Sequence, residues 1–370
     1  MISHLTPQVK HYFSEFANFF KSPIFGCFRT GNRGMIIAEN RAKCKAFAPK
    51  GGKDFMEIMA ITEALARSLM PVRDEQGNKG IFGKVLAVCG SDRFRGAALL
   101  AAGAALKTGA GLCCLACCRP VADAAAVTLP ACTLLPLEMG AEGTLTEAAA
   151  PAILARREDV LILGPGLGNT ADTAGLVRTL VRDWAGALVL DADGLNVLAG
   201  DIVLINKESR PAVLTPHPGE AARLLGVSIS AVLAEPEAAA KTLSALTGAV
   251  VLLKGAVTRI AGPAGQLWYL DAPNSGLAKG GSGDLLSGVI GALLARGLTA
   301  EQSAILGAWL HSRAGALAAG ELGRDAMLPE DTCGMIAAAL AEMTGGDAEL
   351  AKIDARIEAL QRRRRLLENR

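Results

Sequence analysis

The chain has no apolar run long enough to cross a membrane. A transmembrane helix needs about 20 predominantly apolar residues, and polar or charged residues interrupt every apolar stretch of the 370-residue sequence before that length. The amino-terminal residues also lack the pattern of an export signal, because Glu15, Asn18 and Lys21 break their apolar positions and no small-residue cleavage site follows. We therefore expect a cytoplasmic protein that does not bind membranes.

Cysteine spacing and charge exclude further classes. The nine cysteines are an odd number without the spacing of a disulfide framework, so we expect reduced thiols. With 38 basic and 36 acidic residues the formal charge is only +2, which provides no overall field for nucleic acid. Aromatic residues make up 4% of the chain, whereas 51% is hydrophobic and 42 residues are glycine. This composition excludes wholesale disorder and suits small-residue helices packed on a sheet.

Two compositional shifts divide the chain near residue 55. Eight of the ten phenylalanines, and nine basic against three acidic residues, lie within residues 1–55. We expect these residues to be an amino-terminal extension: an accessory segment, a targeting segment, or upstream sequence from a misassigned start, with the true start near Met56. Residues 56–346 are the predicted main domain and 347–370 a charged carboxy-terminal helix. No aromatic residue lies among Arg362–Arg365, which argues against a nucleic-acid-binding tail.

Apolar runs alternate with alanine-rich helical patterns from residue 84 onward, and several runs are continuously apolar, as strands buried on both faces are. The predicted strands lie at 84–90, 111–118, 131–137, 159–164, 187–194, 212–220 and 249–255. The predicted helices lie at 57–69, 96–108, 170–183, 283–296, 299–319, 331–343 and 348–366. This alternation predicts an α/β fold of three layers, with a mostly parallel central sheet and helices on both faces. Ligands in such folds bind beyond the carboxyl ends of the strands.

The strongest chemical motif is Lys279-Gly-Gly-Ser-Gly-Asp284, which leads directly into an apolar helical run. Small residues at a helix start allow main-chain N–H groups to surround an anion at the positive end of the helix dipole. Gly281, Ser282 and Gly283 are the predicted anion hole. Asp284 is placed to take a proton from a substrate hydroxyl during phosphoryl transfer. The alternative is an aspartate that only caps the helix, but capping requires no preceding glycines.

Two glycine-containing motifs follow predicted strands. Gly164-Pro-Gly-Leu-Gly168 is either part of a binding site or only a tight strand-to-helix turn. Lys254-Gly-Ala-Val-Thr258 brings together a cation, a glycine that allows close approach and a hydroxyl, unless Lys254 is only a surface charge. Neither motif identifies a ligand by itself.

Two acidic motifs also follow predicted strands. In Thr215-Pro-His-Pro-Gly-Glu220, a proline at the helix start fixes the helix entry and holds His217 at the strand end. Glu220 is a candidate ligand for a water or a magnesium ion. Asp191 and Asp193 either cap a helix or position a metal-bound water, and the sequence favours neither role.

Four clustered cysteines have a spacing that suggests a metal site. In a strand, Cys113 and Cys117 face one side of the sheet while Cys114 and Cys118 face the other. The four sulfurs then cannot converge on one tetrahedral ion. We expect them to be small buried side chains.

Taken in order, seven motifs resemble the ADP-dependent (S)-NAD(P)H-hydrate dehydratases of the ribokinase-like superfamily, over about residues 57–343. The motifs are GSDRFRGAA (90–98), GAG (109–111), GPGLG (164–168), DADGLN (191–196), TPHPGE (215–220), KGAVT (254–258) and GGSGD (280–284). The resemblance implies a ribokinase-like fold and the repair of hydrated NADH or NADPH. ADP would phosphorylate the hydroxyl of the S epimer, and phosphate would then leave, so that NAD(P)H is restored and AMP and phosphate are released.

The resemblance also implies site residues. Asp284 is the expected catalytic base, with Mg²⁺ near Glu220 and ADP as co-substrate. The residues expected to contact the nucleotide are Lys254, Gly255, Ala256, Val257, Thr258 and Gly283. The residues expected to contact the hydrated dinucleotide are Ala97, Gly166, His217 and Asp284.

Several expectations concern departures and partners. Residues 1–55 are too short for the epimerase domain that many relatives carry upstream, so we expect the epimerase on a separate chain. Asn274-Ser-Gly276 stands where the family often has Asn-Pro-Gly. The family resemblance implies a homo-oligomer, a homotetramer. Two alternatives stay open: a small-molecule alcohol kinase of the same fold, against which His217 argues because related sugar kinases have asparagine there, and a catalytically silent nucleotide-binding protein.

Overall fold

The computed structural model describes residues 58–205 and 210–344, which belong to a compact unit that begins at Ile58. The described strands form one ten-stranded sheet in the order β1-β10-β9-β8-β7-β6-β5-β2-β3-β4. Their bounds are β1 Met59–Ala60, β2 Lys84–Val88, β3 Leu112–Cys118, β4 Thr133–Leu137, β5 Val160–Leu163, β6 Ala187–Leu190, β7 Ala212–Leu214, β8 Val250–Leu253, β9 Val257–Ala261 and β10 Leu267–Asp271. Strand β9 runs antiparallel to its two neighbours, and the other neighbouring pairs are parallel. The predicted α/β fold with a mostly parallel sheet is confirmed.

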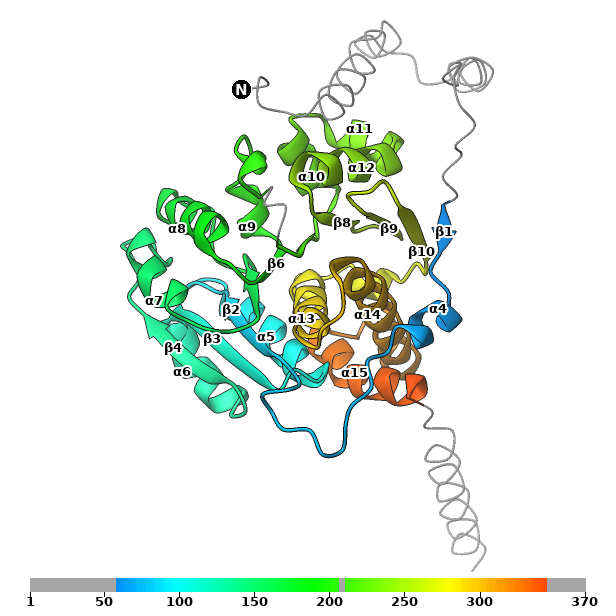
Figure 1. Ribbon diagram of the computed structural model, residues 1–370, viewed down its shortest axis with the longest axis horizontal. Helices are drawn as coiled ribbons and strands as arrows, with labels where there is room; N and C mark the ends of the chain where they lie inside the picture. The colour runs from blue at the N-terminus through cyan, green and yellow to red at the C-terminus, as the bar shows by residue number, and fades with distance from the viewer. Residues whose placement is uncertain (1–57, 206–209, 345–370) are drawn as a thin grey trace, which may run out of the picture. The chain divides into compact units, whose positions relative to one another are not determined.

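Helices cover both faces of this sheet (Figure 1). The helix bounds are α4 Glu63–Ser68, α5 Arg95–Lys107, α6 Arg119–Thr128, α7 Ala150–Leu154, α8 Ala171–Asp183, α9 Asp193–Asn196, α10 Pro218–Leu225, α11 Ile229–Ala234, α12 Pro236–Thr247, α13 Ser282–Ala295, α14 Ala300–Leu322 and α15 Pro329–Met343, with short 3-10 turns at η3 Glu147–Ala149, η4 Ile202–Ile205 and η5 Ser275–Leu277. Helices α5, α13, α14 and α15 pack together on one face, whereas α8, α10 and α12 lie on the other. No helix within the described ranges is long and apolar enough to span a bilayer.

The continuous apolar runs form strands that are buried on both faces, as expected. Strands β2, β5, β6 and β8 lie inside the sheet between two helix layers, and nearly all of their side chains are buried. Strand β3 contains all four clustered cysteines, and they are buried free thiols, as expected. Each of the seven predicted strand segments contains an observed strand.

Helix α13 is the most buried helix of the site-bearing face. It packs against α5 and against β2, β5 and β6. The approach to α5 is so close that a Cβ on Gly288 would lie 2.1 Å from the carbonyl oxygen of Ala101. Glycine is therefore required at position 288. The close contact between α13 and α5 fixes the position of the first turn of α13 relative to the edge of the sheet.

Three predicted segments differ from the structure or lie outside it. Residues 57–69, predicted as one helix, contain the two-residue strand β1 and the six-residue helix α4, because Thr62 accepts a hydrogen bond from Leu65 N and begins the helix there. The predicted helix at 348–366 and the extension at 1–55 lie outside the described residues. The domain boundaries expected at 55 and 346 stay predictions.

Candidate active site

The strand order brings the predicted motifs to one edge of the sheet. The chain runs from β2 outward to β4, returns to β5 beside β2, and then continues to β8 on the other side. In such sheets ligands bind at the carboxyl ends of the strands, near the point where the order reverses. A main-chain hydrogen bond of 2.7 Å from Gly90 N to Pro165 O joins the two loops at that point. The loops after β6, β7 and β8 follow along the same edge.

A pocket of about 740 Å³ lies along this edge. The predicted residues that line it are His217, Lys254, Gly255, Ala256, Thr258, Gly281, Ser282, Gly283 and Asp284. It is also lined by Asp191 and by residues 272–275 and 277–280, with α14 contributing Ala308, His311 and Ser312. The structure thus brings the anion loop, the lysine loop and His217 around one cavity.

The anion loop opens α13 without a side-chain cap. Gly281 is the N-cap residue, with a φ of 104°, and no side chain accepts a hydrogen bond from the first turn. A Cβ at this position would meet Leu100 Cδ1 at 2.6 Å, so both the backbone conformation and the space favour glycine. Ser282 N donates to Lys279 O at 3.3 Å, so Ser282, predicted as part of the anion hole, does not offer its N–H to a ligand. Because no side chain caps the helix, the N–H groups of Gly283 and Asp284 remain available to an anion. The alternative that Asp284 only caps α13 is therefore wrong.

Asp284 has the electrostatics of a general base. Burial raises the pKa of this carboxyl to about 6, and the nearby charges of Asp191, Asp193 and Glu220 also raise it while Lys254 lowers it. A carboxylate with a pKa near 6 is still ionised at neutral pH, yet it accepts a proton more readily than an exposed aspartate. Asp284 lies in the pocket wall, so this carboxylate faces the cavity.

Lys254 is an internal ion-pair partner instead of a surface charge. Its Nζ lies 2.7 Å from Asp191 Oδ1 and 3.8 Å from Glu220 Oε2. Burial lowers the pKa of this lysine, but Asp191 and Glu220 outweigh burial and the net pKa is raised. The cation is thus held in its charged form at the pocket edge. A Cβ on Gly283 would lie 3.1 Å from this Nζ, so the lysine stands directly beside the anion loop.

Asp191 anchors this arrangement, and sequence alone had left its role open. The side chain is 1% exposed, and Ser287 Oγ on α13 donates to its Oδ2 at 2.7 Å. Burial would raise the pKa of Asp191, but Lys254, Ser287 and Thr215 outweigh it and the net pKa is lowered. Asp191 therefore ties the lysine loop to α13 and does not cap α9. The only local signal for it was an acid placed directly after a buried strand.

His217 and Glu220 form a capping box at the start of α10. His217 Nδ1 accepts from Gly219 N at 3.0 Å, and Glu220 Oε2 accepts from His217 N at 2.8 Å. Burial, with Lys254 and Arg223, lowers the pKa of His217, so this side chain is neutral at physiological pH. Burial raises the pKa of Glu220, which is 4% exposed. Glu220 faces His217 and Lys254 from behind the pocket wall and does not line the cavity.

Three predicted residues flank the pocket and do not line it. Ala97 and Gly166 lie against each other where the strand order reverses, since a Cβ on Gly166 would meet Ala97 Cβ at 2.7 Å. Val257 is the first residue of β9, behind the lysine loop. The predicted dinucleotide contacts thus fall into two groups, with His217 and Asp284 in the cavity and the Ala97–Gly166 pair beside it.

Sequence reasoning missed the residues that α14 adds to the cavity. His311 lines the pocket, and burial lowers its pKa to about 4, so the imidazole is neutral. Among the described residues, its Nε2 atom has no hydrogen-bond partner. The signal was a single histidine within an apolar helical run, which the sequence could not place relative to the anion loop.

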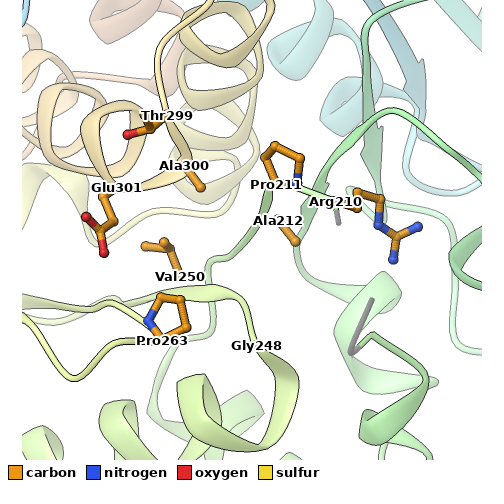
Figure 2. A pocket seen from close by; sticks show the side chains of 9 residues that line it. All are labelled: Arg210, Pro211, Ala212, Gly248, Val250, Pro263, Thr299, Ala300 and Glu301. Atoms are coloured by element: carbon orange, nitrogen blue, oxygen red, sulfur yellow. The ribbon is translucent and has the colours of Figure 1, made fainter. Parts of the chain in front are cut away.

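A second, smaller pocket of about 370 Å³ lies at the opposite edge of the sheet, where β7 and β8 begin (Figure 2). Arg210 borders it and is 6% exposed, but its guanidinium points away from the cavity. The guanidinium donates to the carbonyl oxygens of Val181 and Trp184, both at 2.9 Å, at the end of α8. This arginine stabilises a helix terminus, and the pocket lacks the convergent groups of the first.

Comparison with known proteins identifies the family. A family model described as NAD(P)H-hydrate dehydratase matches residues 85–338, a span that includes all the motifs around the larger pocket. The chain belongs to the NAD(P)H-hydrate dehydratase family. The resemblance deduced from the sequence motifs is confirmed.

Named relatives of this family agree with the match. The chain is 42% identical over 273 residues, 73% of its length, to the bifunctional NAD(P)H-hydrate repair enzyme Nnr of Moorella thermoacetica, of which it covers 52%. It is 36% identical to the ADP-dependent (S)-NAD(P)H-hydrate dehydratase of Xanthomonas campestris, over 72% of this chain and 90% of that one. The chain thus spans about half the length of the bifunctional relatives but most of the monofunctional one.

A solved structure of the family has the same fold. The ADP/ATP-dependent NAD(P)H-hydrate dehydratase of Bacillus subtilis, co-crystallized with ATP and Mg²⁺, superposes with a TM-score of 0.70 at 29% identity. The superposition covers 78% of this chain and 99% of the B. subtilis chain. The predicted ribokinase-like architecture is confirmed.

Proposed function

We propose that this protein is an ADP-dependent (S)-NAD(P)H-hydrate dehydratase, a hydro-lyase that repairs hydrated NADH and NADPH. The observation that carries the proposal is the placement of Asp284 inside the pocket, directly after an uncapped anion loop and beside Lys254. Family membership supplies the reaction class. Together they support a proton acceptor and an anion site at the position where a hydroxyl would be phosphorylated.

The first step is phosphorylation of the ring hydroxyl. Asp284 accepts the hydroxyl proton as the oxygen attacks the terminal phosphorus of ADP, and the bond to AMP breaks. The N–H groups of Gly283 and Asp284 surround the migrating phosphoryl group. Lys254 adds a positive charge beside Gly283. Lys254, Gly255, Ala256 and Thr258, which line the pocket, are the proposed nucleotide contacts. A contact to Val257 stays a prediction from the sequence.

The second step is loss of phosphate. Hydroxide is a poor leaving group, and phosphate is a good one. The lone pair of the ring nitrogen expels phosphate, and loss of a proton from the adjacent ring carbon restores the double bond of NAD(P)H. We propose that His217 and the Ala97–Gly166 pair orient the dinucleotide so that the ring hydroxyl faces Asp284.

Magnesium is a proposed component that would be held mainly by the nucleotide, because the described residues contain no group of three or more His, Cys, Asp or Glu side chains that could hold the ion. Mg²⁺ is usually held by phosphates, waters and one or two carboxylates. The carboxylates that line this pocket are Asp191 and Asp284, and Glu220 lies behind its wall. Both oxygens of Glu220 already face His217, so we propose that Glu220 holds a water of the metal shell. When bound, the ion would neutralise charge on the nucleotide phosphates. The related B. subtilis enzyme was co-crystallized with ATP and Mg²⁺.

The proposed partners extend beyond the active site. The longer relatives are named bifunctional NAD(P)H-hydrate repair enzymes, and we propose that an epimerase on a separate chain supplies the S epimer to this enzyme. The cytoplasmic location and the homotetramer expected from the sequence stay predictions.

A direct assay tests the proposed function. Incubating the chain with ADP, Mg²⁺ and the S hydrate of NADH should restore the absorbance of the reduced nicotinamide, with AMP and phosphate released in equal amounts. Absorbance that does not recover would overturn the proposal. A stable phosphorylated product without free phosphate would instead indicate an alcohol kinase.

A further inference from the structure

Lys279 stands immediately before the anion loop and lines the same pocket as Asp284. Its main-chain oxygen accepts a hydrogen bond from Ser282 N at 3.3 Å, which keeps the lysine next to the first turn of α13. Its Nζ donates to the carbonyl oxygens of Asp325 at 2.7 Å and Met327 at 2.6 Å, in the segment between α14 and α15. An ammonium group has three N–H donors, so one donor remains after these two bonds.

The two lysines that line this pocket differ in their charge environment. Lys254 lies between the carboxylates of Asp191 and Glu220, so nearby negative charge already balances its own. Within the described residues, no carboxylate forms an ion pair with Lys279, whose Nζ faces two uncharged carbonyl groups. Lys279 therefore supplies the uncompensated positive charge of the cavity wall.

The surrounding pocket needs such a charge. The groups that raise the pKa of Asp284 include Asp191, Asp193 and Glu220, so the cavity edge is acidic before any ligand enters. A phosphate group that enters the anion loop approaches these carboxylates. A cation that is not already paired offsets this repulsion, and Lys279 is the lysine in that state.

We propose that Lys279 is a further binding residue for a phosphate group in this pocket, with its third N–H donating to a phosphate oxygen while the other two hold the segment at Asp325 and Met327. This inference rests on the proposed function, because both proposed ligands carry phosphate groups. The phosphate belongs either to the ADP co-substrate or to the pyrophosphate of the dinucleotide. The bond to the α14–α15 segment also fixes the lysine, so its charge is positioned before the ligand binds.

Calorimetry on the full chain tests the proposal and separates the two phosphate sources. The probes are ADP, adenosine and NADH, measured against the wild type and Lys279→Met. Loss of one hydrogen bond to a charged group should weaken binding about tenfold, with the affinity for adenosine unchanged. If only ADP binding weakens, Lys279 contacts a phosphate of the nucleotide. If only NADH binding weakens, it contacts the pyrophosphate of the dinucleotide. Either result supports the proposal.

Two further variants separate charge from scaffolding. Lys279→Gln keeps a neutral donor for the carbonyl groups, so it should lose phosphate affinity like the methionine variant while retaining the wild-type melting temperature. Lys279→Arg keeps the charge and should retain phosphate affinity. Lys84→Met is the matched control, because it removes a half-buried lysine at the opposite end of the strands and should change no affinity.

Three results would overturn the inference. The first is an equal loss of affinity for adenosine and for ADP in Lys279→Met. The second is wild-type affinity for both ADP and NADH in that variant. The third is wild-type affinity for the phosphate ligand in Lys279→Gln. If the wild-type chain restores NADH from its hydrate while any of these is seen, only the role of Lys279 is wrong. If the wild type binds neither ADP nor NADH, both the role of Lys279 and the proposed function are wrong.

Discussion

Helices α10 and α13 both begin beside the pocket and both carry an acid in the first turn, yet they use it differently. At α10, Glu220 accepts a hydrogen bond of 2.8 Å from His217 N and completes a capping box. At α13, the N-cap is Gly281 and no side chain caps the helix. A first-turn acid is therefore a candidate base only when its own helix does not use it as a cap. The following predictions test whether the acid of α10 contributes mainly to stability and the acid of α13 mainly to catalysis.

The largest expected effect is on turnover by Asp284→Asn. A general base contributes roughly 10²- to 10⁴-fold, so kcat should fall by about that factor in the nicotinamide absorbance assay. Asp172→Asn, in the first turn of α8, is the matched control and should retain activity. An active Asp284→Asn enzyme would remove the base assignment.

The same variant should not lose stability. Burial raises the folded pKa of Asp284 to about 6, above the value of about 3.9 for an unfolded aspartate. Its ionised form therefore destabilises the fold, and this contribution grows as the pH rises from about 4 to about 6. Above pH 6, Asp284→Asn should melt at the wild-type temperature or higher.

A second prediction concerns the glycine that opens α13. Gly281→Ala combines a φ of 104° with a Cβ only 2.6 Å from Leu100, and such strain costs about 1–3 kcal/mol. We expect a lower free energy of unfolding in urea and weaker ADP binding, because the first-turn amides shift. Gly280→Ala is the matched control, since its φ is not positive and its Cβ would meet nothing within 4 Å. Equal effects of the two substitutions would contradict the role of Gly281.

The acid of α10 gives the complementary result. Glu220→Ala removes the capping bond to His217 and should lower the free energy of unfolding by about 1 kcal/mol. Glu220→Gln keeps an oxygen that accepts from His217 N, so its stability should match the wild type while half-saturation requires several-fold more Mg²⁺. If Glu220→Gln shows an unchanged magnesium requirement, Glu220 serves α10 alone.

These comparisons also show what sequence could and could not predict. The buried strands and the glycine-rich start of α13 were predictable because continuous apolar runs and clustered glycines have few alternative structures. The pairing of Lys254 with Asp191 was not, since the two residues are far apart in the sequence and only the order of β6, β7 and β8 brings them together.

The missed elements have a similar cause. Strand β1 has two residues, and its pairing with β10 depends on a partner more than 200 positions away. The local signals of His311 and Lys279 did not show their surroundings, because these depend on how α14 and the α14–α15 segment pack around the anion loop. Residues that contact each other across the fold, and not residues within one motif, were the ones that sequence left open.

The smallest expected effect concerns the pH profile. Asp284 must be ionised to accept a proton, so kcat/KM should fall as the pH drops below about 6, the pKa that burial and neighbouring acids give it. Asp193 contributes to that raised pKa, and its Oδ2 accepts from Gly168 N at 2.8 Å. Asp193→Asn can keep this hydrogen bond while removing the charge, so the acidic limb should move to lower pH by less than about one unit. If the acidic limb of the kcat/KM profile moves to higher pH in Asp193→Asn, another group sets the profile. The same conclusion follows if the limb stays in place in both Asp193→Asn and Asp284→Glu.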